Sequence, residues 1–178
     1  MPAYHRDTLE VDWTFFGELC RALALRVARN YDPEIVVGIT KAGVIPGVVV
    51  ASILQRDFAS MGVTRLGSST SPTLVTEPPA SVTGRRVLIV DETCDSGDTL
   101  KLAKSAVRKL NPLEVRTAVS FRTGAYEPDY FALATESFII LPWDRVVIIG
   151  GELVLRPDYA ARLNDAGTSG LQSDKTDS

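Results

Sequence analysis

The stretch VLIVDETCDSGDTL, Val87 to Leu100, constrains the fold more than any other part of the chain. It opens with four apolar residues that favour β structure, as in a strand buried on both faces. Two adjacent acids follow, then a turn that contains Gly97. Helical spacing of apolar residues begins next and predicts a helix over Asp98 to Lys109. A buried strand, a tight turn and a helix form the repeating unit of a parallel α/β sheet.

The same alternation recurs elsewhere in the chain. Apolar spacing predicts a helix over Asp12 to Asn30, and VIPGVVVASILQ, with Pro46 in its first turn, predicts another. Strands are predicted over residues 34–39, 58–66, 86–90, 114–122, 130–134 and 146–149. Strands joined by right-handed helical crossovers give an α/β fold with a mainly parallel twisted sheet flanked by helices.

Composition restricts the class of protein. The chain has 178 residues, 45% hydrophobic and 23% charged, which suits one globular domain over residues 1–164 and a polar, disordered tail over 165–178. No apolar run could span a bilayer and no secretion signal is evident, so we expect a cytoplasmic protein without a membrane partner. The net charge of −3 argues against a nucleic-acid partner. Cys20 and Cys94 are isolated, which argues against a disulfide framework or a cysteine metal site.

The segment from Gly67 to Gly84 is rich in Ser, Thr and Pro and has no periodicity. A long stretch without regular structure inside a compact domain is usually a functional loop. We therefore expect a lid over a site here, with a disordered insertion as the alternative.

The loop DETCDSGDT, residues 91–99, can hold an anion, because free N–H groups at a turn and a helix N-terminus point together. Asp91 and Glu92 cannot hold phosphate, but they can accept hydrogen bonds from sugar hydroxyls or approach Mg²⁺. These parts predict a sugar-phosphate site at the carboxyl edge of the sheet, which the loop TKAG, residues 40–43, also reaches. The alternative is a simple helix cap beside two solvated acids. A P-loop is excluded, because Val44 and Ile45 replace its Lys and Ser/Thr.

These residues carry a resemblance to a known family. VLIVDETCDSGDTL resembles the phosphoribosyl-pyrophosphate motif of type I phosphoribosyltransferases, which has four hydrophobic residues, two acids and then Asp-Thr-Gly or a variant. VDWTFFGELCRALALRV and EIVVGITKAGVIPGVVVASIL resemble the opening of the xanthine–guanine branch. FIILPWD, Phe138 to Asp144, resembles the purine-binding segment of that branch. The similarity covers residues 11–144.

The resemblance implies a type I phosphoribosyltransferase fold with a small hood from residues 1–30 and about 125–164, and a homo-oligomer, either a dimer or a tetramer. It implies a non-proline cis peptide between Thr40 and Lys41, catalytic roles for Lys41 and Asp95, and Mg²⁺ at Asp91 and Glu92. The residues that it implies for binding phosphoribosyl pyrophosphate are Thr40, Lys41, Ala42, Gly43, Asp91, Glu92, Asp95, Ser96, Gly97, Asp98 and Thr99. Lys41 could instead be a solvated surface lysine.

The resemblance also implies a base-binding set, made of Arg122, Phe138, Ile139 and Asp144. Asp144 would read the edge of the base or hold a second metal. Phe138 would stack on the base, and its alternative is a place in the core. Arg122 would donate to the 6-oxo group of a purine, and its alternative is a pair with Glu127 or Asp129.

The implied activity is the transfer of 5-phosphoribosyl from phosphoribosyl pyrophosphate to a 6-oxopurine, which gives a nucleoside monophosphate and pyrophosphate. The chain departs from the family pattern in three places: Asp98 lies close to the phosphate cradle, only Ser68-Ser69-Thr70 stands where the branch has Ser-Tyr, and Arg122 replaces a lysine. Asp98 suits the helix dipole yet opposes a dianion, so it should point away or weaken binding. The departures leave open a non-catalytic regulator that senses phosphoribosyl pyrophosphate or a nucleotide, and an enzyme for another base.

Overall fold

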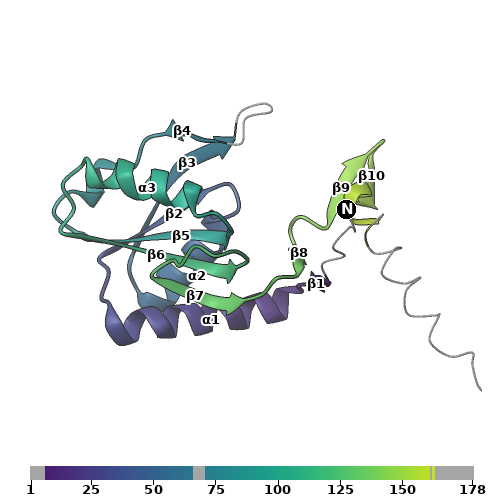
Figure 1. Ribbon diagram of the computed structural model, residues 1–178, viewed down its shortest axis with the longest axis horizontal. Coiled ribbons are helices and arrows are strands. Elements are labelled where there is room, and N and C mark those ends of the chain that lie inside the picture. The colour runs from purple at the N-terminus through teal and green to yellow at the C-terminus, as the bar shows by residue number, and fades with distance from the viewer. Residues whose placement is uncertain (1–6, 66–70, 161, 163–178) are drawn as a thin grey trace, which may run out of the picture. The chain divides into compact units, whose positions relative to one another are not determined.

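The computed structural model describes residues 7–65, 71–160 and 162 (Figure 1). The chain divides into two compact units. The larger unit is residues 17–135, and the smaller unit comprises residues 1–16 and 136–178. The sequence predicted one domain with a hood, and the predicted tail over 165–178 lies outside the described residues.

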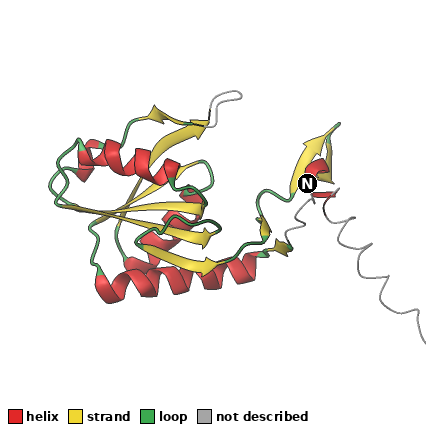
Figure 2. Ribbon diagram, in the orientation of Figure 1, coloured by secondary structure: helices red, strands yellow, loops and turns green. Residues whose placement is uncertain are grey.

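The larger unit is built on a six-stranded sheet in the order β4-β3-β2-β5-β6-β7. All neighbouring strands are parallel except β4, which runs antiparallel to β3. This arrangement confirms the predicted α/β class with a mainly parallel sheet (Figure 2). The strands are β2 Ile35–Thr40, β3 Asp57–Arg65, β4 Pro72–Thr76, β5 Arg86–Cys94, β6 Glu114–Arg122 and β7 Tyr130–Ala134.

Helices cover both faces of this sheet. Helices α1, Trp13–Asn30, and α2, Val44–Leu54, lie on one face, and α3, Asp98–Arg108, lies on the other (Figure 1). Leu19, Leu23 and Val27 of α1 recur at four-residue spacing and are all buried, as the periodicity predicted. Because the central strands are covered on both faces, every residue from Ile35 to Ile39 is buried, which explains the unbroken apolar run.

Two segments of the larger unit differ from the sequence predictions. Strand β5 does not end at Val90 but continues to Cys94, because its pairing with β6 continues to Cys94 and Arg122. In the predicted lid, Pro72–Thr76 forms β4 and Ala80–Val82 forms a short 3₁₀ helix, so the expectation of no regular structure is wrong there. Strand β4 lies at the sheet edge, where proline is tolerated. Residues 67–70 lie outside the described residues, and the function as a lid stays a prediction.

The smaller unit holds two small sheets. Strand β1, Thr8–Glu10, pairs parallel with β8, Phe138–Ile140. Strands β9, Val146–Ile149, and β10, Glu152–Leu155, form an antiparallel hairpin around Gly150 and Gly151, whose φ angles are 61° and 89°. The predicted strand over 146–149 therefore exists, and its partner is β10 rather than a strand of the main sheet. Among the helices of the described chain, none is long and apolar enough to cross a membrane.

A matched pair of leucines in α1 tests the packing of this helix. Leu23 is 0% exposed and Leu25 is 53% exposed, on the same helix two residues apart. We expect Leu23→Ala to lower the free energy of unfolding by about 2–5 kcal/mol, because it leaves a cavity in the core. We expect Leu25→Ala to change it by less than about 0.5 kcal/mol. Urea unfolding of both variants decides this, and similar losses for the two would contradict the assigned faces of α1.

Candidate functional site

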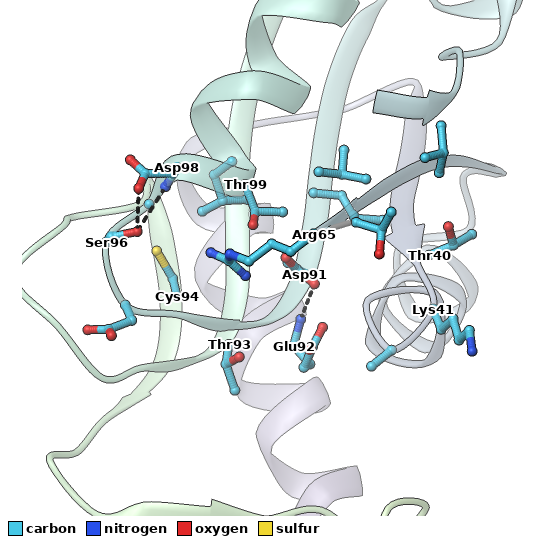
Figure 3. A pocket seen from close by; sticks show the side chains of 18 residues that line it. Thr40, Lys41, Arg65, Asp91, Glu92, Thr93, Cys94, Ser96, Asp98 and Thr99 are labelled. Carbon is cyan, nitrogen blue, oxygen red and sulfur yellow. Dashed lines mark hydrogen bonds between the residues drawn. The ribbon is translucent and has the colours of Figure 1, made fainter. Parts of the chain in front are cut away.

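A cavity of about 910 Å³ opens at the carboxyl edge of the parallel strands in the larger unit (Figure 3). It is bordered by the loop after β2, the end of β3, the end of β5 and the first turn of α3. Ten of the eleven residues predicted to bind phosphoribosyl pyrophosphate line it; Gly43 does not. The lining residues are Ile39, Thr40, Lys41, Ala42, Val63, Thr64, Arg65, Val75, Asp91, Glu92, Thr93, Cys94, Asp95, Ser96, Gly97, Asp98, Thr99 and Leu100.

The first loop of the cavity follows β2 and contains TKAG. The peptide bond between Thr40 and Lys41 is cis, as the resemblance implied. Gly43 is buried, and a Cβ on it would lie 2.7 Å from both the Oδ1 atom of Asp91 and the carbonyl oxygen of Ile39. A larger residue would collide with the end of β5, so glycine here lets the loop lie directly against Asp91.

The acid pair lies at the centre of the cavity. Asp91 is only 7% exposed, and its Oδ1 accepts a hydrogen bond of 2.9 Å from the backbone N–H of Glu92. Burial raises the pKa of Asp91 well above its usual range, and the side chain of Glu92 with its negative charge raises it further. The hydrogen bond from the backbone N–H of Glu92 and the positive charge of Arg65 oppose the rise. The pair is therefore costly to ionise unless a cation or hydroxyl donor is nearby.

The acid pair also fits the ligand chemistry of Mg²⁺. No group of three or more His, Cys, Asp or Glu side chains suited to a metal occurs in the described part of the chain. Mg²⁺, however, keeps several waters and is commonly held by one or two carboxylates together with substrate phosphates. The two adjacent carboxylates of the cavity supply such a set, and Asp91 and Glu92 remain the predicted ligands.

The turn between β5 and α3 depends on two glycines. Gly97 has a φ of 77°, and a Cβ on it would lie 2.2 Å from the ring of Tyr126. On the other side, a Cβ on Gly124 would lie 2.2 Å from the Oδ1 atom of Asp95. The loop that holds Tyr126 and Gly124 thus packs closely on the turn and positions the carboxyl group of Asp95.

Asp98, in the first turn of α3, is held by polar contacts of its own. Its Oδ2 accepts a hydrogen bond of 2.8 Å from the hydroxyl of Ser96, and its Oδ1 lies 3.1 Å from the Nζ of Lys101. The hydrogen bond from Ser96, followed by that from Lys101, lowers the pKa of Asp98. Asp98 is therefore ionised at neutral pH and brings a negative charge to the rim of the cavity.

The residues predicted to bind the base divide between the two units. Arg122, in the larger unit, donates a hydrogen bond of 2.9 Å to the Oε1 of Glu127, and this pair is the alternative that the sequence left open for Arg122. Its guanidinium also lies 4.7 Å from the ring centre of Phe131. In the smaller unit Phe138 and Ile139 lie in β8. The guanidinium of Arg162 lies 4.1 Å from the ring centre of Phe138.

Asp144, also in the smaller unit, already has partners at both carboxylate oxygens. Its Oδ1 accepts a hydrogen bond from Arg156 and its Oδ2 one from the hydroxyl of Tyr159. Burial, followed by the bond to Asp144, raises the pKa of Tyr159 to about 12. A role for Asp144 toward the base stays a prediction, and it would require one of these contacts to change.

Sequence reasoning missed several residues that line the cavity. Arg65, the last residue of β3, points its side chain into the cavity, and Thr93 and Cys94 line it from β5 (Figure 3). A basic residue at the carboxyl end of a strand was the signal that could have identified Arg65. Burial raises the pKa of the Cys94 thiol to about 11, so it stays protonated at neutral pH.

The fold and the cavity together define an α/β protein with an acid pair beside a helix N-terminus at the carboxyl edge of its sheet. Comparison with protein families agrees with this class. Residues 12–150 match the family model of the phosphoribosyl transferase domain, and the chain belongs to this family.

Individual relatives agree with this assignment. The chain is 30% identical over 152 residues to a xanthine-guanine phosphoribosyltransferase of Cereibacter sphaeroides, covering 79% of this chain and 89% of the relative. It is 28% identical over 153 residues to a protein of the same name from Gluconobacter oxydans, covering 81% and 89%. The crystal structure of a purine phosphoribosyltransferase from Pyrococcus horikoshii matches with a TM-score of 0.70 and 27% identity, covering 80% of this chain and 98% of that one.

Two glycines with positive φ separate backbone strain from a side-chain clash at the turn. Gly97 and Gly84 have φ angles of 77° and 69°, but a Cβ at Gly84 would meet nothing within 4 Å. Alanine costs about 1–2 kcal/mol at either position, because L-residues disfavour this conformation. We expect Gly97→Ala to lower the free energy of unfolding by at least about 1 kcal/mol more than Gly84→Ala, because it also meets Tyr126. Urea unfolding measures this difference.

The companion variant Tyr126→Ala identifies the source of that difference. In its background the excess cost of Gly97→Ala should shrink, since the ring that the new methyl group meets is gone. An unchanged excess would contradict the packing of Tyr126 on the turn.

Proposed function

We propose that this chain is a purine phosphoribosyltransferase, which transfers 5-phosphoribosyl from phosphoribosyl pyrophosphate to hypoxanthine, guanine or xanthine. The observation that carries the proposal is the single cavity in which the TKAG loop and the DETCDSGDT loop meet. The similarity to relatives named xanthine-guanine phosphoribosyltransferase supports the choice of a 6-oxopurine.

The residues of the cavity suit three parts of the substrate. Backbone N–H groups of the turn from Asp95 to Thr99, at the N-terminus of α3, hold the 5′-phosphate. Asp91 and Glu92 accept hydrogen bonds from the ribose hydroxyls. The loop from Thr40 to Gly43, with the ammonium group of Lys41, faces the pyrophosphate.

The reaction breaks the bond between the anomeric carbon and pyrophosphate through a state with oxocarbenium character, as in glycoside hydrolysis. Lys41 and the backbone N–H groups of its loop stabilise the negative charge that develops on the leaving pyrophosphate. Asp95, positioned against Gly124, takes the proton from the purine ring nitrogen that attacks the anomeric carbon. Asp91 and Glu92 would hold Mg²⁺, which would supply further positive charge to stabilise the leaving pyrophosphate.

On the base side we propose that Phe138 and Ile139 contact the purine ring and that Asp144 reads its edge. Arg122 reads the 6-oxo group, because an acceptor on the base matches a guanidinium donor. The pair of Arg122 with Glu127 is partly exposed, so exchanging it for a contact to the base costs little.

A screen of bases tests the activity directly. Pyrophosphate release is measured with phosphoribosyl pyrophosphate and Mg²⁺ in the presence of hypoxanthine, guanine, xanthine or adenine. Release with the 6-oxopurines supports the proposal. Tight binding of phosphoribosyl pyrophosphate without release for any base contradicts it in favour of a non-catalytic regulator.

Removing the charges of the acid pair should abolish substrate binding without unfolding the protein. We expect Asp91→Asn with Glu92→Gln to raise the Kd for phosphoribosyl pyrophosphate by about a hundredfold or more, since charged hydrogen bonds to the ribose and the Mg²⁺ ligands are lost. Because burial disfavours the ionised form of Asp91 in the folded protein, we expect the free energy of unfolding at neutral pH to rise. Calorimetric titration and urea unfolding measure the two effects.

The matched control is Asp32→Asn with Glu34→Gln. It changes the same residue types just before β2, where both acids pair with Arg86 at the opposite edge of the sheet. Binding by the control should match that of the wild type. If the Asp91 and Glu92 variant also binds like the wild type, the assignment of ribose and Mg²⁺ to this pair is wrong.

Substitution of Arg122 tests the reading of the base. We expect Arg122→Met to lower the ratio of kcat/KM for hypoxanthine over adenine by about tenfold to a hundredfold, because the donor to the 6-oxo group is lost. Arg116→Met is the control: Arg116 lies on the same strand but pairs with Glu114 and stacks on Tyr31. An unchanged ratio in Arg122→Met shows that Arg122 does not read the base.

A further inference from the structure

The charges around the cavity are unbalanced for a site that takes phosphate. Among the described residues that line it, Asp91, Glu92, Asp95 and Asp98 are acidic, whereas Lys41 and Arg65 are the basic ones. Asp98 is the acid at the start of α3, where a dianionic phosphate would meet the helix N-terminus. An ionised carboxylate there repels phosphate, so a nearby cation is needed on the same side of the cavity.

Lys101 does not supply that cation to the ligand. Its Nζ lies 3.1 Å from the Oδ1 of Asp98, 3.1 Å from the carbonyl oxygen of Ser96, and 5.1 Å from the ring centre of Tyr126. Lys101 is not among the residues that line the cavity. It therefore holds Asp98 from outside the cavity and leaves the interior without its charge.

Arg65 is in the cavity itself. It ends β3, and its side chain extends into the cavity towards the part formed by Asp91 and Thr99 (Figure 3). The hydrogen bonds from Ser96 and Lys101 lower the pKa of Asp98 most, and the positive charge of Arg65 lowers it further, so the charge of Arg65 also acts at the start of α3. Lys41, in contrast, is on the loop after β2.

We propose that Arg65 is a phosphate-binding residue that completes the 5′-phosphate subsite and offsets the charge of Asp98. The assignment deepens the proposed function and rests on it. A guanidinium can donate two parallel hydrogen bonds to phosphate oxygens, which suits a long side chain that enters the cavity from the end of β3. The turn then contributes its backbone N–H groups from one side and Arg65 contributes its charge from the other.

Ribose 5-phosphate is the probe, because it carries the 5′-phosphate without pyrophosphate or base. Its Kd is measured by calorimetry at constant ionic strength for wild type, Arg65→Met, Arg65→Lys, Asp98→Asn and the double variant Arg65→Met with Asp98→Asn. We expect Arg65→Met to raise the Kd by about tenfold to a hundredfold and Arg65→Lys to raise it less, since lysine keeps the charge but not the paired donors. In the Asp98→Asn background the loss on Arg65→Met should be severalfold smaller.

Arg108→Met, an exposed arginine in the last turn of α3 outside the cavity, is the control for the change in net charge and should bind like the wild type. Urea unfolding confirms that each variant is folded. The assignment is overturned if wild type does not bind ribose 5-phosphate, if Arg65→Met binds it like Arg108→Met, or if the loss is the same with and without Asp98. The Kd for free pyrophosphate is measured for the same variants. If Arg65→Met weakens the binding of pyrophosphate but not that of ribose 5-phosphate, the assignment is also overturned.

The outcome is distinguishable from failure of the proposed function. If Arg65→Met weakens the binding of ribose 5-phosphate, but the wild type releases no pyrophosphate with any purine, the phosphate subsite stands and the catalytic proposal fails. If pyrophosphate is released but Arg65→Met leaves ribose 5-phosphate binding unchanged, the enzyme assignment stands and the role of Arg65 fails.

Discussion

The site depends on the burial of one carboxyl group. Asp91 lies under the loop after β2, which approaches it so closely that only glycine fits at position 43. A carboxyl group in this environment resists ionisation, and Glu92 beside it increases the resistance. The protein offsets part of this cost with the charge of Arg65. The remaining imbalance favours ligands that bring cations or hydroxyl donors to the acid pair, as phosphoribosyl pyrophosphate with Mg²⁺ would.

The carboxylate of Asp98 is unfavourable for a phosphate ligand at the start of α3. Asp98 places a carboxylate at a helix N-terminus that otherwise attracts anions. Lys101 and Ser96 restrain that carboxylate from outside, while Arg65 acts on it across the cavity. Arg65 thus links the two ends electrostatically. The proposed role of Arg65 would offset the charge that Asp98 brings to the phosphate motif.

Long elements with strong periodicity were predicted well. The bounds of β6 agree with the prediction, and α1 starts one residue later than predicted, because alternation or helical spacing over many residues leaves few other arrangements. Strand β4, in contrast, was taken for part of a plain loop, since the partner that makes a short segment a strand lies elsewhere in the chain. The same reason explains why β5 runs on to Cys94 beside β6.

At the site, the sequence by itself determined the local chemistry: a buried strand that leads into Asp91 and Glu92, and a glycine turn into α3. Neighbouring residues in one segment have few ways to arrange themselves, so their spacing is informative. Only the tertiary structure decided which distant side chains meet. It brought Arg65 into the cavity, paired Arg122 with Glu127, and gave Asp144 its partners Arg156 and Tyr159. Such pairings depend on distances in space between side chains, which residue spacing along the chain does not encode.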